Sequence, residues 1–344
     1  MNFYKGKDVV VTGGASFIGS HLVEKLVYLG SNVTVLDDLS SGKINNLSSV
    51  FSKIRVIIGD LRNQEFAKSS IAGHEIVFHL ANIHGGRGFI ESHPGEIAQN
   101  FLIDGNVLLA AHESRVFNFC YVSSACVYPI NLQEMNSSSE SRYLSEEMAD
   151  IHMGSGANAD GVYGWAKLMG ELALKSYNKQ FGMEGVSCRL FTVYGPRENE
   201  SHAIIAFIAR ALLKQDPYQI WGTGNQDRNF TFVDDVVHGL LLSTAKIRDC
   251  SSINIGTKEI TKIKDAVNEV CRIVGHQPNQ FTFDQTKPEG VSKRAASTRL
   301  QRDVLGWEPQ ISFEEGIART IEWYSENTNL EDLRISLENK SMER

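Results

Sequence analysis

The sequence predicts an α/β fold, a doubly wound parallel sheet with a smaller α/β lobe beside it. Two observations predict this fold. Short apolar runs alternate with longer segments of helical period through the first half of the 344 residues, which is the pattern of repeated strand–helix units. A glycine-rich turn, TGGASFIG at 12–19, stands between the first apolar run and the first helical segment. Such a turn is where a parallel sheet commonly binds an anion.

The first half contains apolar runs that we expect to be strands and amphipathic segments that we expect to be helices. The expected strands are 9–12, 32–37, 54–59, 76–80 and 119–123, and the expected helices are 18–29 and 100–113. Ligands of a doubly wound sheet bind at the carboxyl ends of its strands. The residues that follow each strand are therefore the first candidates for a site.

The pattern becomes less regular after about residue 185. We expect a strand at 185–189 and a helix at 203–214, followed by short elements to about 324. The chain is therefore expected to divide into a sheet domain at 1–185, to which part of 230–260 returns, and a smaller lobe at 186–324. The remaining tail at 325–344 is polar and charged, so we expect a frayed helix or disorder there.

Composition argues against several classes of partner. The net charge is −7 and no run of lysine and arginine occurs, which is not typical of a protein that binds nucleic acid. No stretch approaches the roughly 18 apolar residues of a membrane span, and the first residues lack the pattern of a secretory signal. The five cysteines are scattered without a CxxC pair, so no metal site is expected. We expect a cytoplasmic protein.

The glycine-rich turn and the acid at the end of the second strand predict an NAD site. Gly13 permits the tight turn, and Gly19 lets the helix approach the strand closely. The usual middle glycine is Ser16, which we expect to displace the pyrophosphate slightly. Asp37 ends the second strand, where a carboxylate accepts from the ribose hydroxyls and disfavours the 2′-phosphate of NADP. Further cofactor contacts are expected from Phe17, Ile18, Asp60, Leu61, Leu80, Ala81 and Asn100.

A Tyr-x-x-x-Lys pair predicts acid–base chemistry beside this cofactor. Tyr163 and Lys167 lie four residues apart in a long helical segment, so both side chains share one face of the helix. A lysine ammonium stabilises a phenolate, and the positive nicotinamide ring is expected to lower the tyrosine pKa further. Ser124, at the end of the fifth strand, can hydrogen-bond the same substrate hydroxyl. We expect Tyr163 to be the general base and both members of the pair to contact the cofactor.

The motifs occur together in an order that resembles one enzyme family. TGGASFIGS, Asp37, YVSSACVYP at 121–129 and YGWAK at 163–167 resemble the extended short-chain dehydrogenase/reductase family of nucleotide-sugar epimerases and dehydratases. The resemblance covers about residues 5–324. It implies a Rossmann fold, catalytic NAD, a nucleoside diphosphate sugar as substrate and a homodimer.

The same resemblance implies substrate-binding residues. Arg228 and Arg294 match positions at which this family grips the substrate diphosphate, a task that suits guanidinium forks. The double-glycine loop at 81–90, which contains Gly86 and Arg87, resembles a loop that lets backbone approach the sugar ring. Trp221 is expected near the nucleotide base.

The two residues after Ser124 select among the reactions of the family. Sugar dehydratases carry Asp-Glu there, whereas this chain has Ala125 and Cys126, so dehydration is not expected. A cysteine at this position resembles GDP-mannose 3,5-epimerases and GDP-L-fucose synthases, which take a second acid/base from the segment after YGP. His202 occupies that segment here. We expect Cys126 and His202 to exchange protons at carbon 5, carbon 3 or both, beside a transient 4-ketone.

Three alternatives stay open. A 4-epimerase of the UDP-glucose or UDP-glucuronate type would need no second acid/base. An epimerase–reductase resembling GDP-L-fucose synthases would use NADPH, which Asp37 disfavours. A non-enzymatic NAD-binding regulator would be expected to lose Tyr163 or Lys167, and both are present. The resemblance favours GDP as the nucleotide, with UDP, dTDP and CDP open.

Overall fold

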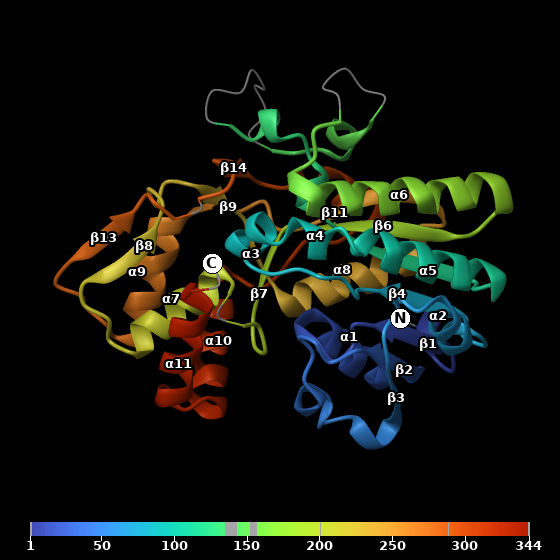
Figure 1. Ribbon diagram of the computed structural model, residues 1–344, viewed down its shortest axis with the longest axis horizontal. Coiled ribbons are helices and arrows are strands. Elements are labelled where there is room, and N and C mark those ends of the chain that lie inside the picture. Colours follow the sequence, from blue (N-terminus) through green and yellow to red (C-terminus); the bar gives the residue numbers. More distant parts are fainter. Residues whose placement is uncertain (1, 135–142, 152–156, 200, 288, 343–344) are drawn as a thin grey trace.

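The computed structural model describes residues 2–134, 143–151, 157–199, 201–287 and 289–342. Figure 1 shows a larger part built on one sheet and a smaller part beside it, formed mainly by the second half of the chain. Within the described ranges no helix is long and apolar enough to cross a membrane.

The larger part is a seven-stranded sheet in the order β11-β6-β5-β4-β1-β2-β3. All its strand pairs are parallel, so the predicted doubly wound sheet is confirmed. The strand order reverses between β1 and β4, and the carboxyl ends of the strands leave a crevice at such a point. The strands are β1 (Asp8–Thr12), β2 (Asn32–Asp37), β3 (Ile54–Ile58), β4 (Ile76–His79), β5 (Asn118–Ser124), β6 (Gly185–Leu190) and β11 (Asp249–Ile255).

Helices cover both faces of this sheet, which explains why its strands are apolar throughout. Successive side chains of a strand point to opposite faces. Val10 of β1 accordingly packs in one cluster with Ile103 and Leu174, whereas its neighbour Val9 packs in another with Leu22. The helices on the first face are α2 (Gln64–Ile71), α5 (Asn100–Glu113) and α6 (Gly161–Phe181), and those on the second are α1 (Phe17–Tyr28) and α8 (Val233–Lys246).

The smaller part consists of short strands and four helices in the described chain. β7 (Thr192–Tyr194) pairs with β10 (Phe230–Phe232), and β8 (Tyr218–Trp221) pairs with β13 (Phe281–Asp284). β9 (Asp227–Arg228) lies between β12 (Thr261–Lys262) and β14 (Lys293–Arg294) and places Arg294 opposite Arg228. The helices are α7 (Ala203–Leu212), α9 (Ile263–Val274), α10 (Phe313–Asn327) and α11 (Leu330–Met342), and two short helices, α3 (Arg87–Ser92) and α4 (Pro94–Ile97), follow β4.

The described part of the tail is helical, which is one of the two expected outcomes, but this helix is packed against the core. α10 continues to Asn327, and α11 covers 330–342 and contacts α7. Leu333 is 1% exposed and Leu337 is also buried in the core. These two leucines, four residues apart among polar residues, give the helix a narrow apolar stripe that the overall polarity of the segment hides. The proposed domain boundaries stay a prediction.

Candidate active site

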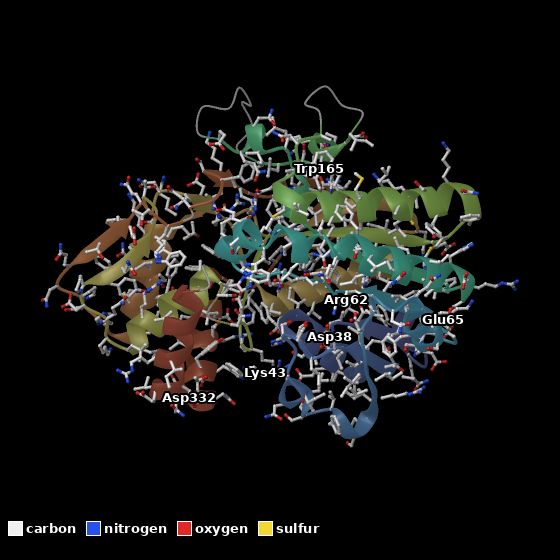
Figure 2. The ribbon with its side chains drawn as sticks, in the orientation of Figure 1. Asp38, Lys43, Arg62, Glu65, Trp165 and Asp332 are labelled. Carbon is white, nitrogen blue, oxygen red and sulfur yellow. The ribbon has the colours of Figure 1, made fainter. Side chains whose placement is uncertain are left out.

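A cavity of about 880 Å³ opens at the carboxyl ends of the central strands. Its lining includes Asp38 and Lys43 after β2 and Asp332 of α11. Figure 2 labels these three residues, two on the sheet part and one on α11. Most of the predicted cofactor residues and three predicted catalytic residues meet here. Those that line the cavity are Gly13, Ser16, Phe17, Ile18, Asp37, Asp60, Leu61, Leu80, Ala81, Ser124, Tyr163 and His202.

The glycine-rich turn has no room for side chains at two positions. Gly13 has a φ of +68°, and a Cβ there would lie 2.9 Å from the backbone nitrogen of Ala81. A Cβ on Gly19 would lie 2.1 Å from the Gly13 carbonyl oxygen. The Ser16 hydroxyl donates to that same oxygen at 2.5 Å, which ties the turn to the start of α1. The open N-terminus of α1 and this close backbone approach fit the pyrophosphate of a dinucleotide.

We predict that Gly19→Ala destabilises the protein by about 1–3 kcal/mol, the usual cost of overpacking. The added methyl group meets backbone of the turn, which cannot rotate away as a side chain can. Urea unfolding measures the loss. The matched control is Gly105→Ala in α5, where a Cβ meets nothing within 4 Å. The higher helix propensity of alanine should raise the stability of this control by at most about 1 kcal/mol. Equal stability of the two variants would contradict this account of the turn.

Asp37 joins the turn to the end of β2. Its two carboxylate oxygens accept the backbone N–H groups of Ala15 and Leu39, each at 2.9 Å. The side chain is buried, and burial raises its pKa although both hydrogen bonds oppose this. Asp37 therefore lines the cavity and binds the glycine-rich turn, at the place that its spacing from Gly19 predicts.

Asp37→Asn should lower the ratio of NAD to NADP affinity by about tenfold or more, since it removes the charge that repels a 2′-phosphate and keeps the side-chain shape. Titration of the purified protein with each dinucleotide measures the ratio. Asp249→Asn, at the exposed start of the edge strand β11, is the control and should leave the ratio unchanged. An unchanged ratio in Asp37→Asn would remove this role from Asp37.

Asn100 is not among the residues that line the cavity, and its contact with the cofactor stays a prediction. Its side-chain oxygen accepts the N–H of Ile83 at 2.7 Å, and its amide donates to the Ile83 carbonyl at 2.8 Å. Asn100 thus clamps the loop after β4. Asp60, after β3, also lines the cavity. Its carboxylate lies 2.7 Å from a guanidinium nitrogen of Arg62, and hydrogen bonding to Arg62 lowers the pKa of Asp60.

Tyr163 and Ser124 lie together at the inner end of the cavity. Burial raises the pKa of Tyr163, and a hydrogen bond from Ser124 lowers it only in part. The Lys167 ammonium lies 5.9 Å from the centre of the Tyr163 ring and donates to the Val122 carbonyl at 2.9 Å. Burial also lowers the pKa of Lys167. The protein's own groups therefore keep the phenol protonated, and the expected low tyrosine pKa depends on the added charge of the nicotinamide.

Cys126 is locked into the same corner of the fold. Its backbone N–H donates to the Ser124 hydroxyl oxygen at 3.2 Å, and its carbonyl accepts the N–H of Asp160 at 2.8 Å. Asp160 comes directly before α6, three residues ahead of Tyr163. Cys126 is partly exposed and is not among the residues that line the cavity.

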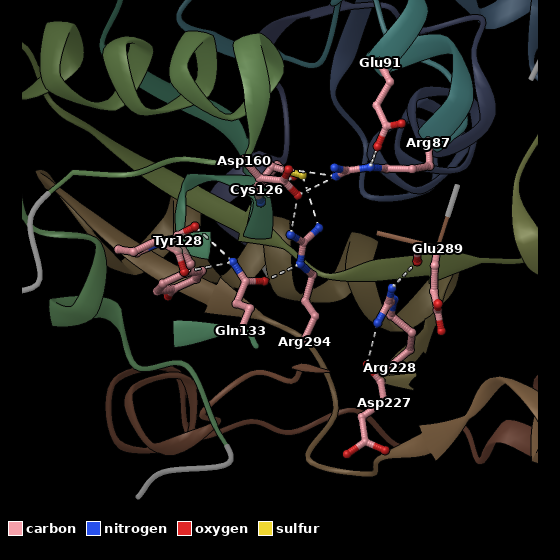
Figure 3. A network of polar contacts seen from close by, with 12 residues as sticks. Arg87, Glu91, Cys126, Tyr128, Gln133, Asp160, Asp227, Arg228, Glu289 and Arg294 are labelled. Atoms are coloured by element: carbon pink, nitrogen blue, oxygen red, sulfur yellow. Dashed lines mark hydrogen bonds and ion pairs between the residues drawn. The ribbon is translucent and has the colours of Figure 1, made fainter. Parts of the chain in front are cut away.

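Two of the predicted substrate arginines meet at Asp160, as Figure 3 shows. Its carboxylate accepts from Arg87 at 2.7 and 2.8 Å and from Arg294 at 2.7 Å. Burial opposes the ionisation of Asp160, but Arg294 and Arg87 outweigh it and lower the pKa of that carboxyl. The arginines thus hold a buried carboxylate between them.

Arg228 lies beside this pair with backbone partners. It donates to the carbonyls of Asp227 at 2.8 Å and of Glu289 at 3.4 Å. Burial, with the positive charges of Arg294 and Arg87, lowers its pKa to about 10. An anion at this place would relieve that repulsion, so the cluster suits a diphosphate.

Trp221 and Gly86 lie outside the cavity lining. Trp221 ends β8, with the Lys287 ammonium 5.3 Å from its ring centre. Glu289 links the turn after β8 to Arg228. Its carboxylate accepts from the Thr223 hydroxyl at 2.5 Å, and its backbone carbonyl accepts from Arg228. Gly86 directly precedes α3, whose first residue is Arg87. Their predicted contacts with the nucleotide and the sugar stay predictions.

His202 is the residue directly before α7, and it lines the cavity. Its ring centre lies 5.6 Å from that of His84, which also lines the cavity. The Nδ1 of His202 is 3.5 Å from a carboxyl oxygen of Glu198. Glu198 is 5% exposed, lines the cavity, and has its pKa raised well above the ordinary value by burial. The imidazole therefore lies beside a buried carboxylic acid.

Glu198→Gln should stabilise the protein, and the gain should grow as the pH rises from 5 to 8. A glutamate in the unfolded chain ionises near pH 4.3. Because the folded pKa is raised, the folded state keeps a proton that the unfolded state releases, and this costs stability above that pH. Urea unfolding at both pH values should give a difference on the order of 1 kcal/mol or more. A gain that does not depend on pH would contradict the raised pKa.

Comparison with known proteins decides the family. The family model described as the NAD dependent epimerase/dehydratase family matches residues 9–256. The chain belongs to this family. NAD is therefore its cofactor, as predicted, and the turn, Asp37 and the cavity are the parts of the chain that fit it.

Relatives with different reactions are similarly close. GDP-mannose 3,5-epimerase of Arabidopsis thaliana is 30% identical over 95% of this chain and 85% of its own length. A putative UDP-glucose 4-epimerase of Methanocaldococcus jannaschii is 31% identical over 93% of this chain and 99% of its own. The crystal structure of a Thermotoga maritima UDP-glucose 4-epimerase with UDP-glucose is 27% identical, covers 92% of this chain and 98% of its own, and has a TM-score of 0.82. The chain is thus a member of a family of nucleotide-sugar enzymes.

Sequence reasoning missed Asp160, Gln133 and Glu198. Asp160 carries the signal of a helix cap three residues before Tyr163, but its side chain makes no capping hydrogen bond and binds arginines instead. Gln133 accepts from Arg294 at 2.7 Å. Asp160 and Gln133 bind arginines more than 70 positions away, which nothing in the local sequence indicates. Glu198 lies only four residues before its partner His202, so the spacing of these two residues was the available signal.

Proposed function

We propose that the protein is a nucleoside-diphosphate-sugar epimerase that inverts carbon 5, carbon 3 or both through a transient 4-keto sugar. The observation that carries this proposal is the place of Cys126. Its backbone binds both the Ser124 hydroxyl and the residue that precedes α6, so a thiol lies next to the Ser124–Tyr163 pair where dehydratases of the resembled family carry acids.

The chain's own residues divide the chemistry between them. Tyr163, with the hydroxyl of Ser124, takes the proton of the carbon 4 hydroxyl. NAD, when bound against the glycine-rich turn and Asp37, would supply a reversible hydride acceptor for carbon 4. The Lys167 ammonium lies 5.9 Å from the centre of the Tyr163 ring and places a positive charge near the phenol.

A ketone at carbon 4 acidifies the hydrogens on carbons 3 and 5. Cys126 beside Ser124 and His202 on the wall of the cavity then remove and return these protons. Thiols and imidazoles both exchange protons readily near neutral pH. Glu198 supports His202 in this role, because a carboxyl oxygen of Glu198 lies 3.5 Å from the Nδ1 of His202.

The arginines supply the diphosphate site. Arg228 and Arg294 lie opposite each other on neighbouring strands. Burial and the charges of Arg294 and Arg87 lower the pKa of Arg228, and an anion there would relieve the repulsion between the arginines. The nucleotide base is proposed to lie toward Trp221, with GDP as the first candidate by similarity to the Arabidopsis relative and UDP next by similarity to the 4-epimerases.

Incubation with candidate nucleotide sugars in heavy water tests the proposal. Deuterium should enter carbon 5 or carbon 3 of recovered sugar, located by NMR. GDP-mannose and UDP-glucose are the first two substrates. A product formed without solvent deuterium would contradict the proposal and leave a 4-epimerase.

That 4-epimerase is the second candidate, favoured by the similarity to the Methanocaldococcus and Thermotoga enzymes. It would use Tyr163, Ser124 and Lys167 alone. An epimerase–reductase is disfavoured by Asp37, and a regulator by the complete Tyr163–Lys167 pair.

A homodimer is proposed on the neighbouring helices α5 and α6, which contact each other. They leave Phe101, Leu102, Leu172 and Phe181 exposed. A cytoplasmic location stays a prediction of the sequence.

A further inference from the structure

Asp104 of α5 is a buried acid outside the cavity lining. One of its carboxylate oxygens accepts from the Tyr121 hydroxyl at 2.6 Å, and the other lies 3.0 Å from Nε2 of His79. All three side chains are buried. Burial of a charge is unfavourable unless it is compensated, so a carboxylate at this place needs a positive charge nearby.

The hydrogen bonds of Thr12 assign the proton on His79. The Thr12 hydroxyl oxygen accepts the backbone N–H groups of Leu80 at 3.2 Å and Ala81 at 3.1 Å. A hydroxyl has two lone pairs and one proton, so its proton points to Nδ1 of His79 at 2.8 Å. Nε2 of the ring then carries the proton that is donated to Asp104. His79 is therefore a neutral donor, as the Tyr121 phenol is, and neither cancels the charge of the carboxylate.

Lys167 is the positive charge that faces this carboxylate. Its ammonium lies 5.0 Å from the centre of the Tyr121 ring, whose hydroxyl binds Asp104. Lys167 is 1% exposed, and its hydrogen bond to the Val122 carbonyl brings no negative charge. Burial lowers the pKa of Lys167, and the charge of Asp104 is the largest of the effects that oppose this.

A second buried carboxylate near Lys167 has a cation of its own. Glu171 lies one turn further along α6 and binds Arg189 through both carboxylate oxygens, at 2.9 and 2.7 Å. Arg189 is buried as well, so the two charges largely cancel. The effect of Glu171 on the pKa of Lys167 is smaller than that of Asp104. Asp104 is thus the main counterion of the lysine.

The other ionisable groups around Lys167 do not supply a negative charge. Tyr121 of β5 and Tyr163 of α6 are phenols, and burial raises the pKa of each. His84, in the loop after β4, has its pKa lowered by burial and by the charge of Lys167. These three side chains therefore face the lysine as neutral groups.

We propose that Asp104 is a positioning residue of the reaction, the buried counterion that keeps the Lys167 ammonium charged beside Tyr163. The inference rests on the proposed use of Tyr163 as the base. A charged lysine stabilises the phenolate that forms when Tyr163 takes the proton of the carbon 4 hydroxyl, and a neutral lysine does not. Through His79 and Thr12 the same carboxylate is fixed to the end of β1, directly before the glycine-rich turn.

The titration of Lys167 in the NAD-loaded protein tests this without the reaction. Lysine labelled with carbon-13 at Cε reports the charge of each ammonium by NMR, and the Lys167→Met protein identifies the signal. Asp104→Asn and Asp104→Ser remove the charge, and each should lower the titration midpoint of Lys167 by about one pH unit or more. Glu113→Gln removes a carboxylate from the exposed end of the same helix and should leave the midpoint unchanged. Tyr121→Phe removes a partner of Asp104 but keeps its charge, so its midpoint should stay close to that of the wild type.

Two charge-removing variants are used so that one folded protein, checked by its melting temperature, suffices. An unchanged midpoint in a folded variant overturns the inference. A lowered midpoint supports it even where no nucleotide sugar is converted, an outcome that would contradict the proposed function alone.

The pH profile of kcat gives a second readout that a merely structural role would not move. Lys167 is charged below its pKa, so its loss of charge sets the alkaline limb of the profile. In Asp104→Asn this limb should move to lower pH by about one unit, with little change in KM. Movement of the acidic limb alone would mean that Asp104 acts directly on Tyr163, and would overturn the inference too.

Discussion

The Tyr163→Phe protein should turn over its nucleotide sugar about 10²–10⁴-fold more slowly than the wild type, the range that general acid–base catalysis contributes. The phenol stands on the cavity wall with Ser124 as its hydrogen-bond partner. Its loss removes the group that takes the carbon 4 hydroxyl proton and leaves the buried Lys167 in place. The rate constant kcat, measured with saturating substrate, checks this result.

The control for this variant lies on the same helix. Tyr177 is in α6, with its ring 5.4 Å from His112 and 5.6 Å from Phe181, outside the cavity lining. Tyr177→Phe should keep the wild-type kcat. A Tyr163→Phe enzyme as active as this control would remove Tyr163 from the chemistry.

The Cys126→Ala protein should lose solvent exchange at the one ring carbon that the sulfur serves, by about 10²–10⁴-fold. Exchange at a carbon served by His202 should continue, because Tyr163, Ser124 and the cofactor turn are untouched. NMR of the sugar recovered from heavy water locates each label. The expected pattern therefore also tells which carbon belongs to which residue.

Cys271→Ala is the matched control, a buried cysteine of α9 away from the cavity lining. Its exchange at both carbons should equal that of the wild type. Wild-type exchange in Cys126→Ala would show that the sulfur moves no proton.

The cofactor turn could be predicted from sequence because it depends on short distances along the chain. Gly13, Gly19 and Asp37 lie on β1, α1 and β2, and the parallel pairing of β1 with β2 brings their ends together. The hydrogen bond from Ala15 to Asp37 then follows from the turn itself. The Tyr163–Lys167 pair is local in the same sense, since one helix turn relates the two.

The arginine cluster could be predicted only in part, because its partners come from distant segments. Arg294 reaches Cys126 through β14, a two-residue strand beside β9. No periodicity marks so short a strand. A buried amide that binds the loop after β4, as Asn100 binds Ile83, has the same sequence signal as one that contacts a ligand.

Retention of the carbon 4 hydrogen is the most direct test of the central claim that this enzyme oxidises and re-reduces one sugar carbon. A nucleotide sugar that the enzyme converts is prepared with deuterium at carbon 4, and the product is analysed by mass spectrometry and NMR. The account predicts that the deuterium stays at carbon 4 of the product and that no reduced cofactor accumulates. Loss of that deuterium to solvent, or net formation of NADH, would contradict it.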